Sequence, residues 1–210
     1  MKKAKWMIIN VLLITGMAQS ASVTLDENTP AKVASWYGGY PNGAPTGVAK
    51  SGVGNNVTIR SLVVGMAANK IATNNTRGGL DFDVSGQQTI TNATLNLYLT
   101  GKTPPSYDLA VYAKMTNGAL HASSPLAKAA YSENGYVDTG LRLATDSAAG
   151  WHAFDVTSVV TAAVANGGVV SFRFQMLNDD GLPFTAGSVY ALSSFGSTAT
   201  APSLDLCTTP

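Results

Sequence analysis

The sequence predicts an all-β fold, a jelly-roll β-sandwich with one short helix inserted between late strands. Three observations predict it. Segments of alternating apolar and polar residues recur about every 8–15 residues, which is typical of sandwiches and barrels. Residues 150–177 follow a strand, helix, strand pattern. Only 12% of the residues are charged and 21 are glycine, whereas globular proteins average about 25% charged residues. This composition favours an extracellular β-protein.

The N-terminus has the pattern of a secretory signal peptide. Three lysines lie within residues 1–5, an apolar run covers residues 6–17, and Ala18 and Ser20 are the small residues before a cleavage site at Ala21. The apolar run is shorter than the roughly 20 residues of a membrane span. We therefore expect residues 1–20 to be removed and residues 21–210 to form a single secreted domain, extracellular or periplasmic, without membrane contact.

The first half of the mature chain is expected to alternate between strands and turn-rich segments. Residues 36–56 are crowded with Gly, Pro and Asn and predict a loop, and residues 70–77 predict a polar turn. Period-2 alternation predicts strands at residues 22–25, 57–64, 79–84 and 90–100.

Two of these strands assign faces clearly. In residues 90–100, alternation points three leucines to the core and three polar or aromatic side chains outward: Leu95, Leu97 and Leu99 against Thr94, Asn96 and Tyr98. In residues 79–84, it points three apolar side chains inward, Leu80, Phe82 and Val84, and two carboxylates outward, Asp81 and Asp83.

The second half contains the predicted helix. A strand is expected at residues 107–115, one helical turn within 122–133, and further strands at 137–143, 188–193 and 203–207. Residues 151–156 form a strand whose Trp151, Ala153 and Asp155 share a face. The period then changes, because Val156, Val159, Val160, Ala163 and Val164 form the apolar stripe of a short helix.

Local residues predict how this helix begins and ends. Thr157 or Asp155 supplies the N-cap oxygen, and Asn166–Gly167 supplies a left-handed exit. A strand then follows at residues 169–177, with Arg173 pointing outward between two phenylalanines.

The last strand is expected to close the sandwich beside the first. Leu204 and Leu206 enter the core next to Val23 and Leu25, and Cys207 is expected to be buried. A single cysteine excludes an internal disulfide.

No catalytic motif is present in the sequence, so we expect no enzyme activity. His121 and His152 are isolated, and neither a nucleophile elbow, a phosphate loop nor a zinc signature occurs. The pair Asp81 and Asp83 can serve as glycosidase carboxylates or bind Ca²⁺, but a solvated outer face explains them. Residues 178–181 can hold Ca²⁺, but an ordinary turn explains them. We therefore expect no metal and no cofactor.

Carbohydrate binding is the function that the sequence favours. The candidate binding residues are three aromatic residues of the glycine-rich segment and three cations that follow it: Trp36, Tyr37, Tyr40, Arg60, Lys70 and Arg77. Aromatic rings cover the C–H surface of a sugar, while cations meet a uronate carboxylate through charge-assisted hydrogen bonds. The net charge of +1 becomes about −2 without the three signal lysines, so no basic patch indicates nucleic acid.

The order of several short motifs resembles the DNRLRE-type jelly-roll domains, which are related to alginate-binding carbohydrate-binding modules. The motifs are LVVG at 62–65, RGGLDFDV at 77–84, ITNATLNLY at 90–98, LAVY at 109–112, GWHAFDVT at 150–157 and PSLDL at 202–206. The chain departs from the family where Asp81 stands in place of a second arginine, and where residues 116–149 replace a Trp- and Pro-bearing segment.

The resemblance implies a polysaccharide or cell-surface glycan as the partner, with uronates as one candidate class. Two alternatives stay open. Low charge and unpaired strand edges suit a structural or adhesive protein that self-associates, and the same fold can also carry a lyase or hydrolase.

Overall fold

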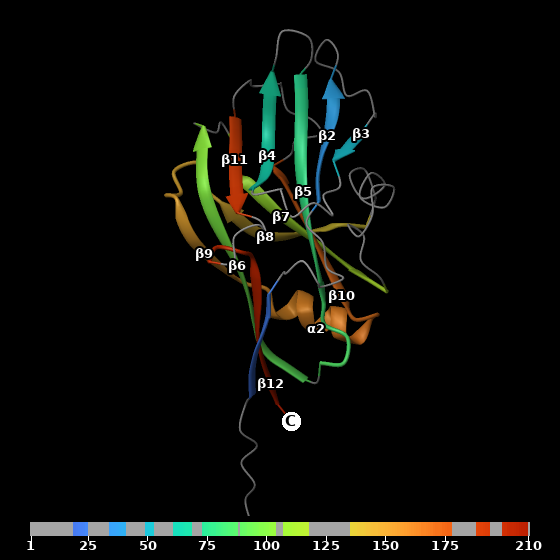
Figure 1. Cartoon of the computed structure of the whole chain (residues 1–210). Coiled ribbons are helices and arrows are strands. Elements are labelled where there is room, and N and C mark those ends of the chain that lie inside the picture. Colours follow the sequence, from blue (N-terminus) through green and yellow to red (C-terminus); the bar gives the residue numbers. More distant parts are fainter. Residues whose placement is uncertain are drawn as a thin grey trace, which may run out of the picture.

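The protein is a β-sandwich with one short helix (Figure 1). The computed structural model describes residues 19–24, 34–40, 49–52, 61–68, 73–87, 89–103, 107–117, 135–177, 188–193 and 199–209. Within these residues the strands are β1 (Gln19–Thr24), β2 (Ala34–Tyr40), β3 (Ala49–Gly52), β4 (Ser61–Ala68), β5 (Thr73–Asp83), β6 (Thr89–Thr103), β7 (Leu109–Thr116), β8 (Val137–Leu143), β9 (Gly150–Asp155), β10 (Val169–Met176), β11 (Ser188–Ser193) and β12 (Ser203–Thr209). Helix α2 (Thr157–Ala165) joins β9 to β10. The predicted all-β class with one inserted helix is confirmed.

All strand pairs described are antiparallel, in the order β1-β12-β6-β11-β4-β5-β10-β7-β8, with β9 on β6, β2 on β5 and β3 on β2. Strands β11, β4, β5 and β2 lie side by side in front of β7, β8 and β10 (Figure 1). The long strands change partners along their length: β5 pairs with β4 through residues 73–76 and with β10 through 78–83. One hydrogen-bonded ladder therefore runs through both layers.

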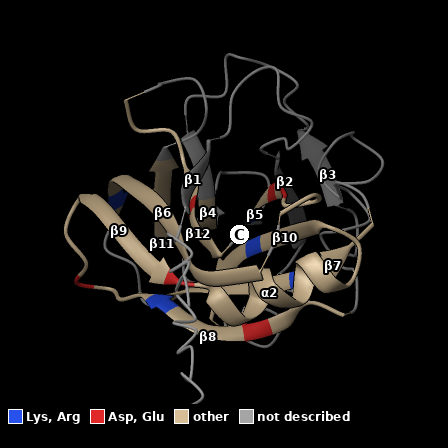
Figure 2. Ribbon diagram, turned by 90° about the horizontal axis from the view of Figure 1, so that it is seen from below, with Lys and Arg blue, Asp and Glu red and all other residues tan. Residues whose placement is uncertain are grey.

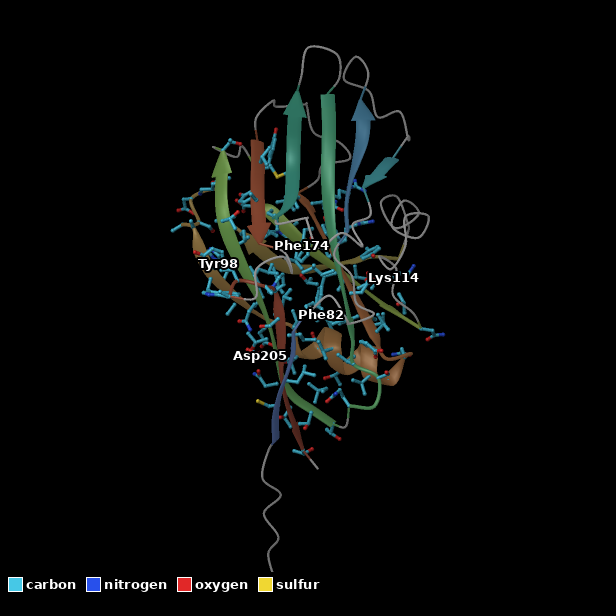
Figure 3. The ribbon with its side chains drawn as sticks, in the orientation of Figure 1. Phe82, Tyr98, Lys114, Phe174 and Asp205 are labelled. Atoms are coloured by element: carbon cyan, nitrogen blue, oxygen red, sulfur yellow. The ribbon has the colours of Figure 1, made fainter. Side chains whose placement is uncertain are left out.

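The core lies between the layers and follows the predicted alternation. Leu95, Leu97 and Leu99 of β6 are fully buried, as the sequence predicts. Phe82 and Phe172 face each other edge to face, with ring centroids 6.0 Å apart, a favoured aromatic geometry. Figure 3 shows Phe82 near the middle of the molecule, with Tyr98 toward one side and Lys114 toward the other. The core is therefore built from alternate residues of strands distant in sequence.

Helix α2 packs against β6, β7 and β10 at one end of the sandwich (Figure 1). Its buried residues are Val160 and Ala163, two members of the predicted apolar stripe. The predicted side-chain N-cap is wrong in detail: Val156 is the N-cap, and it has no side-chain capping bond. Asp155 Oδ1 instead accepts hydrogen bonds from the backbone nitrogen of Thr157 at 2.9 Å and from its hydroxyl at 2.6 Å. The carboxylate thus binds the first helical residue, one position too early for a standard cap.

The exit of α2 is made by two glycines. Gly167 and Gly168 have φ of 130° and 82°, which confirms the predicted left-handed exit at Gly167, whereas Asn166 has φ of −123°. A Cβ on Gly168 would lie 2.8 Å from Ser85 Cα. The nitrogen of Gly168 donates to Ala163 O, and its carbonyl accepts from Val84 N at 2.6 Å. Glycine is required here by its positive φ and by the close approach of Ser85, which follows β5.

Several predicted segments have different bounds. The predicted loop at 36–56 contains β2 and β3 instead, and the predicted turn at 70–77 contains the first residues of β5. β4 covers Ser61–Ala68 rather than residues 57–64. The glycine content of residues 36–56 predicts a loop, but pairing with β5 holds β2 in an extended strand. Tertiary context here overrides a weak β-propensity. The predicted turns at 122–133 and 178–181 lie outside the described residues.

The predicted closure between the two ends of the chain is confirmed. β1 pairs with β12 so that Val23 lies opposite Leu204 and Ala21 opposite Leu206. Leu204 and Leu206 are buried, and Leu25 lies outside the described residues. Cys207 is half-buried rather than buried, because it points to the other face of β12. No helix in the described part of the chain is long and apolar enough to cross a membrane.

Candidate functional site

The structure places part of the predicted binding set on two neighbouring strands. Trp36, Tyr37 and Tyr40 belong to β2, and Trp36 lies directly opposite Arg77 of β5. Directly opposed residues of an antiparallel pair share one face of the sheet. Arg60 and Lys70 lie outside the described residues. The register therefore brings one predicted aromatic position beside one predicted cation.

Three charged residues that alternation would expose are buried. Arg77, Asp81 and Arg173 are 3%, 0% and 7% exposed. The prediction that Asp81 and Arg173 face solvent is wrong, and Arg77 does not lie on an open surface. The reason is the position of β5 and β10 inside the sheet, where every residue of β10 is buried. Strands covered on both faces lose the relation between alternation and exposure.

Arg173 is held by tyrosines of the protein itself. Its guanidinium carbon lies 4.3 Å from the ring centroid of Tyr136 and 5.6 Å from that of Tyr112, within the range of cation–π attraction. The hydroxyl of Tyr136 lies 2.8 Å from Ser171 Oγ. The guanidinium of Arg173 therefore interacts with side chains of the protein itself, and we assign Arg173 a structural role.

Strands β9 and β6 carry an aromatic pair that the sequence did not single out. Trp151 of β9 is 51% exposed. It lies opposite Tyr98 of β6, and the two rings meet edge to face with centroids 5.3 Å apart and an interplanar angle of 79°. The predicted shared face of Trp151, Ala153 and Asp155 is confirmed by their exposure. An indole face is thus presented to solvent on a rigid strand.

Polar side chains continue this surface across three strands. Asn96 Nδ2 of β6 donates to Ser203 Oγ at 3.2 Å and to Asp205 Oδ2 at 2.8 Å. Thr94 lies opposite both Asp205 of β12 and Asp155 of β9. Figure 3 shows Tyr98 and Asp205 on the same side of the ribbon. We call this surface the outer face of β9, β6 and β12; its residues are Thr94, Asn96, Tyr98, Trp151, Asp155, Ser203 and Asp205.

Hydrogen bonding holds the charge of Asp155 in place. The hydroxyl of Thr157, followed by its backbone N–H, lowers the pKa of Asp155 below the usual range of an aspartate. Thr157 Oγ1 also accepts a hydrogen bond from Ala93 N at 2.9 Å. One hydroxyl thereby links β9, α2 and β6, so the position of Asp155 on the outer face is fixed without a ligand.

This arrangement has the chemistry of a sugar platform. An indole ring covers the C–H face of a pyranose, and amide, hydroxyl and carboxylate groups bind its hydroxyls. His152 contacts the backbone, with its Nε2 lying 2.9 Å from Ala148 O. In the part of the chain that the structure describes, no three His, Cys, Asp or Glu side chains gather to hold a metal ion.

The outer face could have been predicted only from knowing that β9 pairs with β6. Trp151 and Tyr98 each stand at an outward position of a strand that the sequence predicts, but 53 residues of sequence separate them, and their contact appears only when β9 pairs with β6.

Comparison with known proteins supports the same chemistry. No curated protein sequence matches the chain. Residues 54–206, more than half of the 210-residue chain, match carbohydrate-binding module family 96. This span includes β4 to β11 and most of β12, with the whole outer face. The chain belongs to carbohydrate-binding module family 96, and carbohydrate is its ligand class.

Proposed function

We propose that the protein is a secreted, non-catalytic polysaccharide-binding protein that holds a sugar chain on the outer face of β9, β6 and β12. The observation that carries the proposal is the exposure of the Trp151 side chain. Among the large hydrophobic residues that the structure describes as exposed, it is the aromatic one, with Met115 and Val137 as the others. An exposed indole beside hydrogen-bonding groups is typical of a binding surface rather than of a solvated face.

Secretion and a non-catalytic role are proposed from different observations. Secretion is proposed from the signal-peptide pattern of residues 1–20. A binding role without catalysis is proposed from the family and from the outer face itself, where Asp155 and Asp205 lie on a continuous sheet surface with the side chain of Thr94 between them. A glycosidase needs its two carboxyl groups on either side of a bound glycosidic bond.

The direct test is binding of the mature protein, residues 21–210, to a panel of soluble polysaccharides, measured by affinity electrophoresis and calorimetry. Trp151→Ala is expected to weaken binding at least tenfold, about 1.4 kcal/mol, because a central tryptophan commonly carries much of the binding energy. Val137→Ala is the control, since Val137 is 66% exposed on β8, away from this surface. Unchanged binding by Trp151→Ala would assign the sugar to another surface.

Catalysis is tested in the same preparation. Incubation with each bound polysaccharide should produce no new reducing ends and no unsaturated sugar absorbing in the ultraviolet. Either product, growing with time and protein concentration, would contradict the proposed non-catalytic role.

A second candidate is uronate recognition beside β2, favoured by the register that sets Trp36 opposite Arg77. Arg77 is buried, so this candidate requires a carboxylate to reach its guanidinium past the surrounding side chains. Arg60 and Lys70 are the other two cations of the predicted set. Trp36→Ala and Lys70→Ala should then reduce binding of alginate, whereas Trp151→Ala should not. The reverse result would leave the outer face as the binding site.

A further inference from the structure

We infer that a bulge in β8, closed by the ion pair of Asp138 and Arg142, prevents this edge strand from pairing with β8 of a second copy of the chain. The inference goes beyond sugar binding, because it concerns the edge of a different strand from those of the outer face. It bears on self-association, which the sequence leaves open as an alternative role.

Strand β8 is an accessible edge of the sheet. It stands at one end of the strand order, and within the part of the chain that the structure describes it pairs with β7 alone. Figure 2 shows β8 along the lower border of the sandwich, with an acidic and a basic residue on it. Val137, Asp138 and Gly140 are exposed. An edge of this kind presents backbone N–H and C=O groups that another chain can bind as an added strand.

Apolar surface beside this edge favours association. Val137 and Met115 are 66% and 38% exposed. Both line a hollow of about 320 Å³ between β7, β8 and α2, together with Ala113, Val159 and Ala162. When a strand is added to an edge, main-chain hydrogen bonds give affinity and such hollows accept its alternate side chains. A protein that keeps this edge free therefore needs a feature that opposes pairing.

The bulge interrupts β8 in its middle. Its register against β7 shifts there, so that the three residues 139–141 lie opposite Val111 alone. Gly140, at the centre, has a φ of 78°, a left-handed conformation that favours glycine. A bulge bends its strand and breaks the regular row of backbone groups along the edge. The middle of β8 is therefore unsuited to pairing with a further strand.

Side chains of the same chain hold this bulge closed. Arg142 donates from Nη1 and Nη2 to the two carboxylate oxygens of Asp138, at 2.8 and 2.6 Å. In a regular strand, residues four apart are separated by about 13 Å, so this contact requires the bulge. Asp138 Oδ1 also accepts from Gly140 N at 2.9 Å, and Thr139 Oγ1 donates to Val111 O at 2.6 Å.

Without the bulge the edge becomes complementary to itself. Removing residues 140–141 leaves one residue opposite Val111 and restores the alternation of β8. If two such strands pair antiparallel about their midpoints, Asp138 of each copy lies opposite Arg142 of the other. Opposite charges that face each other across strands stabilise the pair. The two side chains that close the bulge in one chain would then join two chains.

The test is deletion of Gly140 and Leu141 from the mature protein, residues 21–210. The molar mass is measured by light scattering after size exclusion and by sedimentation velocity, over a range of concentrations, with the wild type as the baseline. The deletion should double the mass, because it leaves a straight edge. A variant that is folded by circular dichroism and keeps the mass of the wild type would overturn the inference.

Charge variants of the deleted protein identify the surface that pairs. Adding Asp138→Arg sets two cations against each other in the dimer, and adding Arg142→Asp sets two carboxylates against each other, so each variant alone should lose the dimer. An equal mixture of the two variants should recover it, because every facing pair then has opposite charges. Dimers that persist in both single variants would place association on another surface and contradict the inference.

A second pair of variants keeps the length of the chain. Leu141 packs against the core, so the deletion can prevent folding. A Cβ at Gly140 meets nothing within 4 Å, and Gly140→Val opposes the left-handed φ that the bulge needs, whereas Gly140→Asn tolerates it. Gly140→Val should raise the dimer fraction severalfold over Gly140→Asn. Equal dimer fractions in the two folded variants would show that the bulge does not control pairing.

Discussion

Tyr190 shows at the scale of one residue how a polar group is accommodated in this core. Its side chain is fully buried, and its hydroxyl lies 3.1 Å from Tyr107 O and 3.2 Å from Leu143 O. Burial, with the nearby negative charge of Asp108, raises the pKa of Tyr190 to about 12. The phenol is thus held neutral, and its one O–H is shared between the carbonyl of Tyr107, which precedes β7, and that of Leu143 in β8.

This residue predicts a pH dependence. Tyr190→Phe should lower the free energy of unfolding by about 1 kcal/mol at pH 7, because two buried carbonyls lose a donor. The folded pKa lies above the unfolded value near 10, so the contribution of Tyr190 is complete below pH 10 and is lost as pH rises toward 12. Urea denaturation at pH 7 and at pH 10–11.5 should show the difference between wild type and variant shrinking. A constant difference would contradict the assigned cause.

The Asp138–Arg142 pair predicts a small effect. Their contact of 2.6 Å joins side chains that are 40% and 23% exposed, and exposed pairs contribute at most about 1 kcal/mol. The hydrogen bond from Arg142 lowers the pKa of Asp138, so this contribution is present above pH 4 and disappears as pH falls further. Arg142→Met should lower stability slightly at pH 6 and leave it unchanged at pH 2.5, by urea denaturation. A loss that persists at pH 2.5 would indicate packing instead.

Residue-level burial was only partly predictable. Alternation correctly placed Leu95, Leu97 and Leu99 inside, and it correctly put Trp151 on one face with Ala153 and Asp155. It failed for Asp81 and Arg173, because a strand pattern describes two faces and does not say whether both are covered. That information depends on which strands are central in the sheet, and hence on long-range pairing.

At the scale of the element, α2 was the most predictable feature and the glycine-rich segments were the least. A change of period from 2 to 3.6 identifies a helix locally, whereas β2 and the start of β5 are strands because they pair with each other. The binding surface depends on pairing in the same way: its outward residues are visible in sequence, but their assembly from β9, β6 and β12 is not.

The exit of α2 predicts a contrast between two glycines. Gly168→Ala should lower the free energy of unfolding by at least about 2 kcal/mol, because a left-handed φ and a clash with the backbone of Ser85 both oppose a Cβ. Gly86 also has a positive φ, 78°, but a Cβ there meets nothing within 4 Å, so Gly86→Ala should cost about 1 kcal/mol. Thermal and urea unfolding measure both. Equal losses would show that the contact with Ser85 does not matter.

At the scale of the whole molecule, one core joins both layers, the helix and the C-terminal strand β12. Leucines of β6 lie in the same buried cluster as Leu204 of β12, Phe172 of β10 and Val160 of α2. Because this cluster is continuous, we expect the domain to unfold in one transition.

Leu97 tests this expectation. Leu97→Ala should lower the free energy of unfolding by about 2–5 kcal/mol, the usual cost of a cavity in a close-packed core, while keeping a single transition by fluorescence and circular dichroism. Trp151→Ala, at a half-exposed position, should cost much less. Two separated transitions for Leu97→Ala would show that the layers are independent.

Strand β6 has a consequence for how such a protein can diversify. Its odd-numbered leucines hold the domain together, and its even-numbered residues, Thr94, Asn96 and Tyr98, meet the solvent. Every second codon of one short stretch of gene can therefore vary without disturbing the scaffold. New glycan preferences are then within reach of a few substitutions, which makes this strand the natural place to randomise when engineering a reagent for a chosen polymer.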